Sequence, residues 1–589
     1  MARSRPTFSL RASACLVLAL AGGCVQVASL PLLFNQVTPE QKLDKELDIG
    51  VVGNITEVGN GGMIQVSGVG LVMGLDGTGG SPPGQYRTML EQQMRKQKVV
   101  NPRGLLDNPN NALVLVTAFL PAGVRRGEPI DVEITLPKDS KAISLKGGVL
   151  QECALRNYEN AKNINPEMAN SLLSGHVLAK AKGPLLVGLG NPDDALEQRR
   201  ARIWAGANSL IERSFYFILT KDDMKSAKVA NSIAARLNLQ FQDDPRKQKV
   251  VHDNRELLLV GDVTQQINRN FDSGFGKGEM AKAAGKEVIS VRVPYAYRYN
   301  AERFLRVARL VPLSVPTDVM NAYRLKLEAI LLEPKQTMRA ALRLEALGRD
   351  SIPILRKGLD SGDPLVRFCA AESLAYLGNT AGIEDLAKLA INHPELRAYA
   401  LLAIAGLDEA ICRQKLGELM TIDDPELRSG AFRGLRLIDE NDSRLGETPL
   451  GPFSLHKVAG GSASLVTFAT GIRAEVVIFG PEVTMSTPVK VLAGGEFTVT
   501  AEPRDDRITV SRFTVKGVQR KQCTLTLDDT LQAMIDLGAG YAEIVDLLRN
   551  LEEQKVLSCK VREAVSPPIA GLEAVLQADL KEAKVNMAD

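Results

Sequence analysis

Aromatic side chains are scarce in this chain of 589 residues. Phenylalanine, tyrosine and tryptophan together make up 5% of the sequence, and Trp204 is the single tryptophan. Proteins that bind single-stranded nucleic acid stack the bases on aromatic rings. The scarcity therefore argues against a surface of stacked rings that would hold bases or sugars.

An excess of positive charge is also missing. The 72 lysines and arginines are balanced by 69 aspartates and glutamates, which leaves a formal net charge of +3. Arg3, Arg5 and Arg11 supply three of those positive charges, in a leader without acidic residues, so the rest of the chain is close to neutral. Nucleic-acid-binding domains usually carry a clear basic excess. We therefore expect no nucleic-acid partner.

Signatures of catalysis and metal binding are absent as well. The four histidines are not spaced as metal ligands, and none of the seven cysteines forms a Cys-x-x-Cys pair. Ser81 does not lie in a Gly-x-Ser-x-Gly elbow. The sequence thus predicts a protein that is not an enzyme, with no catalytic residue, no metal and no cofactor. Cys523 and Cys559 lie in one terminal segment, where they either pair in an oxidising compartment or remain buried thiols.

Long apolar runs are missing beyond the N-terminus, where no stretch reaches the roughly 18 apolar residues of a transmembrane helix. The leader has its basic residues first, then a short apolar segment at 14–21, then Ala21-Gly22-Gly23-Cys24. This order is typical of an exported protein, and small residues before a cysteine resemble a lipoprotein signal. We expect a signal peptide over 1–23, a lipid on Cys24 and a linker over 24–48. Ordinary cleavage after Ala21 or Gly23 is the alternative.

Glycine, in contrast, is concentrated in residues 63–81, which open with strand-like apolar residues. Such density indicates backbone that turns through positive φ or packs closely against a neighbour. Met73 stands where a dinucleotide-binding fingerprint needs its third glycine, and no lysine follows Gly79-Gly80 as a phosphate-binding loop requires. We therefore predict a strand and a Gly-rich turn instead of a phosphate site. The turn glycines are Gly68, Gly70, Gly74, Gly77 and Gly79.

Residue spacing predicts the elements around this stretch. Residues 130–136 alternate apolar and polar side chains, which is the pattern of a half-buried strand, and 51–58 and 112–120 are further predicted strands. Residues 86–98 have helical spacing and end in the basic run Arg95-Lys96-Gln97-Lys98, where positive charge suits the helix dipole. Residues 222–237 predict another helix that starts with two aspartates.

Residues 63–81 resemble a segment of the flagellar P-ring protein family, which carries a similar Gly-x-Gly-Leu-Val-x-Gly-Leu-x-Gly-Thr-Gly sequence. Further segments resemble this family in the same order, namely the strand at 111–121, Ser-Leu-Lys-Gly-Gly-Val-Leu at 144–150 and Ile-Glu-Arg at 211–213. Trp204-Ala205 replaces the family's Pro-Asn pair, so we expect a different local turn there. The resemblance implies a P-ring-like N-terminal region over 49–320.

Residues 335–440 change to helical sequence rich in alanine and leucine. Three prolines recur at spacings of 30 and 31 residues, each after aspartate or histidine and each followed three residues later by arginine. Proline is favoured in the first turn of a helix, and aspartate caps that turn. A fixed period of helices indicates a solenoid, because one unit cannot bury its apolar face alone. The pattern resembles HEAT repeats, and its structural residues are Asp363, Pro364, Arg367, Pro394, Arg397, Asp424, Pro425 and Arg428.

Strands return after the repeats. Residues 455–565 contain several apolar or alternating strands and two helices, and they resemble the C-terminal part of the P-ring family. Residues 566–589 are expected to be a flexible tail. The predicted fold is α+β and multidomain, with P-ring-like strand-rich domains flanking an α-helical HEAT-like solenoid.

The resemblance implies a structural function in the cell envelope. The P-ring family forms a periplasmic ring, in the peptidoglycan layer, around the flagellar rod. The implied state is therefore a homo-oligomeric ring in the periplasm, with the rod or other envelope proteins as partners and with Cys24 as a lipid anchor to the outer membrane. The alternative is an envelope scaffold lipoprotein that keeps the P-ring-like fold, is not flagellar and binds protein partners through its HEAT-like solenoid.

Overall fold

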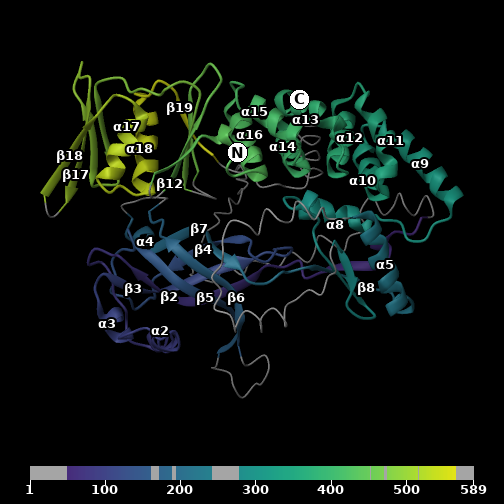
Figure 1. The fold of residues 1–589 in the computed structure, drawn as a ribbon, viewed down its shortest axis with the longest axis horizontal. Coiled ribbons are helices and arrows are strands. Elements are labelled where there is room, and N and C mark those ends of the chain that lie inside the picture. Colours follow the sequence, from purple (N-terminus) through teal and green to yellow (C-terminus); the bar gives the residue numbers. More distant parts are fainter. Residues whose placement is uncertain are drawn as a thin grey trace, which may run out of the picture.

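The structure is a computed structural model, and it describes residues 49–160, 172–188, 194–241, 278–450, 453–469, 474–514 and 517–564. Strand-rich regions lie at both ends of this range, and a block of helices lies between them (Figure 1). The N-terminal region forms the lower half of Figure 1, and the helical block and the C-terminal region form the upper half. The predicted α+β class is confirmed.

Six strands of the N-terminal region close into an antiparallel barrel in the order β2-β3-β4-β7-β6-β5. Residues alternate between buried and exposed along the whole of β4, as the period-two sequence predicts, and its apolar side chains join the core inside the barrel. The strands are β2 (Ile64–Met73), β3 (Asn111–Leu120), β4 (Pro129–Thr135), β5 (Val149–Asn160), β6 (Leu172–Pro184) and β7 (Arg200–Ser209).

Two helices, α2 (Gln85–Lys96) and α3 (Pro102–Asp107), cover the outside of the first two barrel strands. They form a small separate core with those strands, made of Val69, Leu71, Leu90, Met94, Leu106 and Leu113. Strand β3 is therefore buried on most of both faces, one toward the barrel interior and one under the helices. This double burial explains why residues 112–120 form an almost unbroken apolar run.

A second antiparallel sheet has the order β1-β8-β10-β9, and α5 packs against its β9 and β10. Its strands are β1 (Thr56–Gly59), β8 (Phe215–Leu219), β10 (Val288–Val291) and β9 (Ala281–Ala283). The helices of this part are η1 (Val52–Asn54), α4 (Ala195–Gln198), η4 (Asp222–Met224), α5 (Ala227–Gln240), η6 (Tyr295–Tyr297) and α8 (Ala301–Arg309).

Two predicted elements differ from the structure in this region. Residues 51–58 do not form one strand, because the Val51 N–H donates to the Asn54 side chain and the chain turns through η1 before β1 starts. The helix predicted at 222–237 starts later, since the Ser226 hydroxyl accepts from the Val229 N–H and caps α5. The two aspartates before it lie in η4.

The helical block consists of four packed pairs of helices, and α10, α12, α14 and α16 contact one another in succession. It begins earlier than residue 335, because α9 starts at Thr317, and its first pair lacks the proline start of the other three. The helices are α9 (Thr317–Leu331), α10 (Thr337–Leu347), α11 (Ile352–Leu359), α12 (Pro364–Tyr376), α13 (Ile383–Asn392), α14 (Pro394–Leu407), α15 (Ala410–Leu419) and α16 (Pro425–Ile438), with the short helices η7 (Gly348–Ser351) and η8 (Thr380–Gly382) between them.

The C-terminal region has two sheets, ordered β11-β12-β14-β13-β19 and β15-β16-β17-β18, which share one core with α17 and α18. Its elements are η9 (Ser443–Leu445), β11 (Glu447–Leu450), β12 (Phe453–Val458), β13 (Leu465–Phe468), β14 (Glu475–Phe479), β15 (Val489–Ala493), β16 (Phe497–Ala501), β17 (Ile508–Thr514), β18 (Gly517–Cys523), α17 (Leu527–Asp536), α18 (Tyr541–Gln554) and β19 (Lys560–Glu563).

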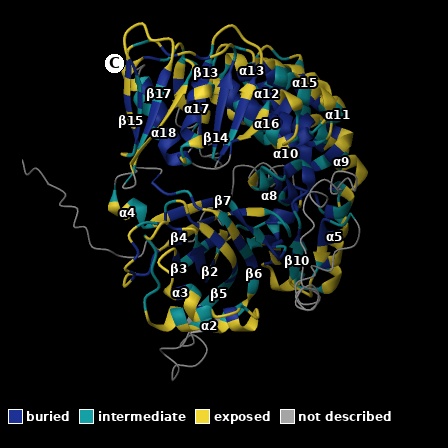
Figure 2. Ribbon diagram, turned by 60° about the vertical axis from the view of Figure 1, so that its left-hand side comes forward, coloured by how far each residue is buried: buried dark blue, intermediate teal, exposed yellow. Residues whose placement is uncertain are grey.

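One continuous apolar core joins the second sheet to the helical block and reaches the first C-terminal sheet. It runs from Val51 beside η1, through α8 and the paired helices, to Val477 and Phe479 of β14. Figure 2 shows buried residues along the inner helices of this block and exposed ones on its outer turns. The helical block is thus packed at both ends against strand-rich regions.

Candidate functional site

The glycines of the 63–81 stretch serve close packing in the barrel wall. Gly68 and Gly70 lie within β2, so they are not part of the predicted turn. A Cβ atom on Gly68 would come within 2.5 Å of the Ala154 carbonyl oxygen, and one on Gly70 within 2.8 Å of the Leu150 side chain. Strand β5 therefore approaches β2 closely because these two residues have no side chain.

The turn itself is shorter than predicted. Gly74 and Gly77 have φ values of +87° and +74°, a conformation that favours glycine. The Gly79 N–H donates to the Pro109 carbonyl at 2.8 Å, and a Cβ on Gly79 would collide with the carbonyl oxygen of Asn111. The turn packs against the chain segment before β3, and its amides are used in that contact.

The basic run of the first helix lies at the surface. Arg95 and Lys96 occupy the last turn of α2, where they are exposed, and Lys98 follows with a φ of +58°. Their position at the C-terminal end of the helix dipole favours positive charge there.

Each of the three prolines is the first residue of a helix, at the start of α12, α14 and α16. The Asp363 carboxylate accepts from the N–H groups of Leu365 and Val366 at the start of α12. The Asp424 carboxylate likewise accepts from the Leu427 N–H at the start of α16. His393 makes no such cap before α14, and its ring lies 3.1 Å from the Glu395 carboxylate instead.

The repeated arginines connect each helix to the chain before it. Arg367, Arg397 and Arg428 donate to carbonyl groups of the preceding segment, at Ser361, Ala390 and Ile422 respectively. Two of the three arginines also donate to residues that come later in the chain. Arg397 donates to both Asp424 oxygens at 3.1 and 2.9 Å, and Arg428 donates to the Ala463 carbonyl of the C-terminal region at 2.6 Å. We call these three residues the arginine ladder.

Replacing Asp424 with alanine should destabilise the helical block more than the same change at Asp363. Loss of a helix cap costs about 0.5–2 kcal/mol. Asp424→Ala also removes the less exposed of the two carboxylates that pair with Arg397, whose own side chain is 8% exposed, and leaves only the exposed Glu426. The Asp363→Ala variant loses the cap alone and is the matched control. Urea denaturation followed by circular dichroism measures both, and equal losses of stability would show that the contact from Arg397 contributes nothing.

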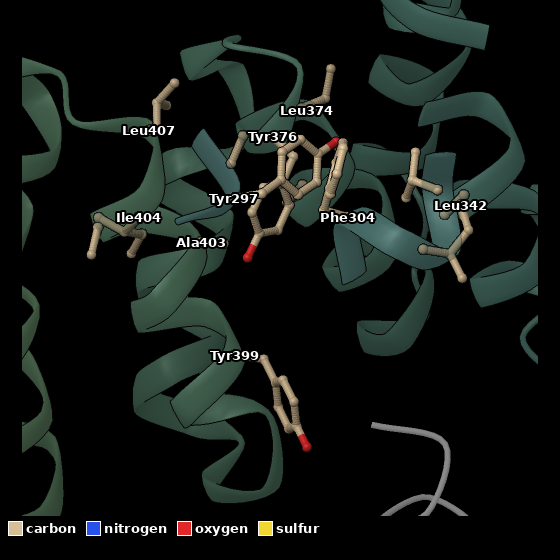
Figure 3. Packing of buried hydrophobic residues seen from close by; sticks show 14 of the residues in the cluster. Tyr297, Phe304, Leu342, Leu374, Tyr376, Tyr399, Ala403, Ile404 and Leu407 are labelled. Carbon is tan, nitrogen blue, oxygen red and sulfur yellow. The ribbon is translucent and has the colours of Figure 1, made fainter. Parts of the chain in front are cut away.

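A buried ionic cluster lies where α8 of the N-terminal region meets α10 and α12. Arg303 donates to Glu345 at 2.6 Å and to Glu372 at 2.6 Å, and the two carboxylates have side chains that are 0% and 3% exposed. The Tyr297 hydroxyl donates to Glu345 at 2.7 Å, and its ring stacks on Tyr376 with centroids 4.7 Å apart. Figure 3 shows these two rings and Phe304 packed together, with Leu374 close by.

Two carboxylates share one arginine in this cluster, so its charges are not fully balanced. Burial raises the pKa of Glu372, Arg303 opposes this rise and the nearby Glu345 carboxylate adds to it, and together they bring the pKa to about 7. Burial also raises the pKa of Tyr297 and of Tyr376. Within the residues that the structure describes, this is where a change of charge would most directly affect the packing of the helical block on the N-terminal region.

The other end of the helical block is joined to the first C-terminal sheet. Arg436 of α16 pairs with the buried carboxylate of Glu475 in β14. The Phe432 ring packs edge-on against His456 at 5.0 Å and against Phe479 at 6.0 Å between centroids. The block therefore has a polar and an aromatic contact at each end.

The barrel and the C-terminal region also touch directly, although the helical block separates them in sequence. Lys146 lies 2.7 Å from the buried carboxylate of Glu543 and 3.5 Å from the partly exposed carboxylate of Glu496. Trp204 packs edge-on against Tyr541, with ring centroids 6.1 Å apart. Trp204-Ala205 is the place where the family pattern has Pro-Asn, and Ala205 takes a φ of +51° there. The departure from that pattern thus supplies a contact to the C-terminal region.

A groove of about 980 Å³ lies along α14 and α16. Its lining is mainly apolar and includes Ala398, Leu402, Gly430 and Leu437, together with the last described residues of the chain, Arg562 to Ala564. Several charged side chains at its border are paired with one another, as Arg397 is with Asp424 and with Glu426. Such a surface suits an apolar ligand better than a charged one.

The sequence did not reveal Arg303 or its two carboxylates. The signal that could have found them is a glutamate inside an otherwise apolar helix, because Glu372 follows Cys369-Ala370-Ala371 and precedes Ser373-Leu374-Ala375. A charged residue on the buried face of a helix needs a partner, since an unpaired buried charge is costly. The contacts of Lys146 and Trp204 carry no comparable local signal.

Several predicted features fall outside the described residues, namely the signal peptide 1–23, Cys24, the linker 24–48 and the tail 566–589. In the described part, Cys523 and Cys559 are both half-buried free thiols, and burial raises the pKa of Cys559 to about 11. No helix there is long and apolar enough to cross a membrane. No group of His, Cys, Asp and Glu residues that could hold a metal ion is found in the described ranges.

Comparisons with known proteins agree on one family. Residues 52–322 match the family model described as flagellar P-ring protein. The match covers the barrel, the second sheet and α8, and it ends early in α9. The resemblance predicted for the N-terminal region is confirmed, whereas the resemblance of residues 455–565 stays a prediction.

Curated relatives support the same family. The chain is similar to the flagellar P-ring proteins of Fervidobacterium nodosum (27% identity, 44% of this chain, 63% of the relative), Campylobacter lari (30%, 33% and 53%) and Sodalis glossinidius (33%, 43% and 59%). The match to this chain thus spans between half and two thirds of the length of these relatives.

Proposed function

We propose that this chain, whose residues 52–322 belong to the flagellar P-ring protein family, is a non-enzymatic component of the cell envelope that forms a periplasmic ring around the flagellar rod. The observation that carries the proposal is this family match. The ring acts sterically, as a bushing in which the rod turns. Flagellar rod proteins or other envelope proteins are its partners, and the action requires no catalytic group.

The direct contact between the barrel and the C-terminal region supports this proposal. Leu186 and Trp204 pack on the core of the C-terminal region, and Lys146, in the connection between β4 and β5, pairs with carboxylates of that region. The N-terminal and C-terminal regions therefore form one continuous body, and the helical block is joined to that body at both of its ends. This is the arrangement expected if a HEAT-like solenoid over 335–440 is inserted into a P-ring-like chain.

Ring formation is tested by electron microscopy of the mature protein purified from an exporting bacterium. A closed ring needs a head-to-tail interface between copies, whose rotation closes after a fixed number of subunits. We therefore expect closed rings of uniform diameter with a smooth bore. Persistent monomers at high protein concentration would overturn the ring proposal.

The same preparation with Cys24→Ala tests the lipid anchor to the outer membrane. An acyl chain adds about 0.8 kcal/mol of membrane affinity for each buried CH₂ group, so the wild-type protein should enter the detergent-rich phase and the variant should stay in the aqueous phase. Equal partitioning of the two proteins would contradict lipid attachment at Cys24.

One observation favours the alternative of an envelope scaffold lipoprotein. The groove along α14 and α16 is an apolar surface of the kind through which solenoids bind protein partners. The presence or absence of other flagellar genes in the same genome separates the two functions. A genome without them, together with monomers in the electron microscope, would favour the scaffold.

A further inference from the structure

The groove along α14 and α16 has the dimensions of a site for one helix. Both helices contain 14 residues, so each is about 21 Å long at 1.5 Å per residue. The small side chain of Ala398 in the lining leaves room for the backbone of a neighbouring helix, and Leu402 and Leu437 provide apolar contact. Gly430 serves the packing of α16 on α14, because a Cβ there would come within 2.6 Å of Leu401. A helix of similar length with an apolar face would fill this groove.

The described chain ends at the groove. Strand β19 pairs with β13 at the edge of the first C-terminal sheet, and the next residue, Ala564, lines the groove together with Arg562 and Glu563. The following four residues can span at most about 14 Å when extended. Residue 568 is therefore within reach of the groove without any crossing of another element.

The sequence after this point repeats the pattern that starts the helices of the block. Ser566-Pro567-Pro568 offers a capping hydroxyl followed by proline, as Asp-Pro does before α12 and α16. Ile569, Leu572, Leu576, Leu580 and Ala583 then recur at three- and four-residue intervals, which puts them on one face of a helix.

Charge also fits this occupant. Residues 566–585 contain three acidic and two basic side chains, so the segment is close to neutral. The carboxylates of Asp424 and Glu426 at the groove pair with Arg397, so a nearly neutral segment meets little charge repulsion from them and can make apolar contact.

We propose that residues 566–585 of this chain, in place of the flexible tail expected from the sequence, occupy the groove on its own α14 and α16, with Leu572, Leu576 and Leu580 toward Leu402 and Leu437. The segment continues the solenoid by one further helix and covers its apolar surface. This inference goes beyond ring formation and does not depend on it.

A cysteine pair in the full-length chain tests the proposal. Leu402→Cys with Leu576→Cys places one thiol in the groove and one on the apolar face of the segment, and mild oxidation should link them within one chain. Leu402→Cys with Ala578→Cys is the matched control, because residues two apart do not share a helix face. Peptide mapping identifies which thiols are joined, and covalent dimers are separated by size.

The expected result is a linkage between positions 402 and 576 whose yield is independent of protein concentration, with little linkage between 402 and 578. Absence of the first linkage, or equal yields from both pairs, would overturn the docking. Covalent dimers that increase with concentration would overturn the assignment to the same chain, because the groove would then take the segment of a second copy. None of these outcomes depends on whether rings form.

Discussion

Replacing Arg303 with methionine is expected to lower the free energy of unfolding of the helical block by about 3–5 kcal/mol, the range for removing one partner of a buried ion pair. The change leaves Glu345 and Glu372 facing each other without the guanidinium that both contact at 2.6 Å. Methionine retains most of the apolar stem of arginine, so the loss comes from the charge and its hydrogen bonds. Urea denaturation monitored by circular dichroism measures the change.

Arg356→Met is the matched control for this variant. Arg356 lies exposed on α11 of the same block, and surface substitutions usually change stability by no more than about 0.5 kcal/mol. Similar stabilities of the two variants would mean that Arg303 does not hold the α8 junction. A lysine at position 303 should recover only part of the loss, because a single ammonium group cannot bind both carboxylates as the arginine fork does.

Stability of the wild-type protein is expected to fall as the pH rises from about 4.5 to above 7, and Glu372→Gln should remove this component. The folded state raises the pKa of Glu372 from 4.5 to about 7, so it binds the proton more tightly than the unfolded state does. The stabilisation is complete below the unfolded pKa and is lost as the pH passes through the folded pKa. The shift corresponds to about 3 kcal/mol.

The measurement is a series of denaturation curves at several pH values for the wild type, Glu372→Gln and Glu302→Gln. Glu302 lies on α8 with a side chain 51% exposed and pairs with Arg306 of the same helix, so its replacement should leave the pH dependence unchanged. A slope that persists in Glu372→Gln would show that another group controls the pH dependence of the junction.

The repeats could be predicted from sequence because their signals are local. Proline fixes its own φ, and the capping carboxylates of Asp363 and Asp424 reach amides two or three residues ahead, so the starts of α12 and α16 are specified within a few residues. The same logic placed the α5 start too early, since both the aspartates of η4 and Ser226 are suitable cap residues.

The barrel and the ionic cluster depend on distant pairings that local patterns do not contain. Alternation identifies β4 as a strand, but its pairing with β7 and the pairing of β2 with β5 join segments far apart in the chain. Arg303 meets Glu345 and Glu372 from positions 42 and 69 residues away. Only the folded arrangement of α8, α10 and α12 brings these side chains together.

The contacts of Lys146 with Glu543 and of Trp204 with Tyr541 give the molecule a second mechanical connection between the barrel and the C-terminal region, besides the helical block. A force that separates the barrel from the C-terminal region is carried by these contacts and, in parallel, by the helical block with its arginine ladder. Elements in series fail at the weakest one, whereas parallel elements share the tension until both give way. A subunit of a ring around a turning shaft would thus resist shear through two linkages, one direct and one through the helical block.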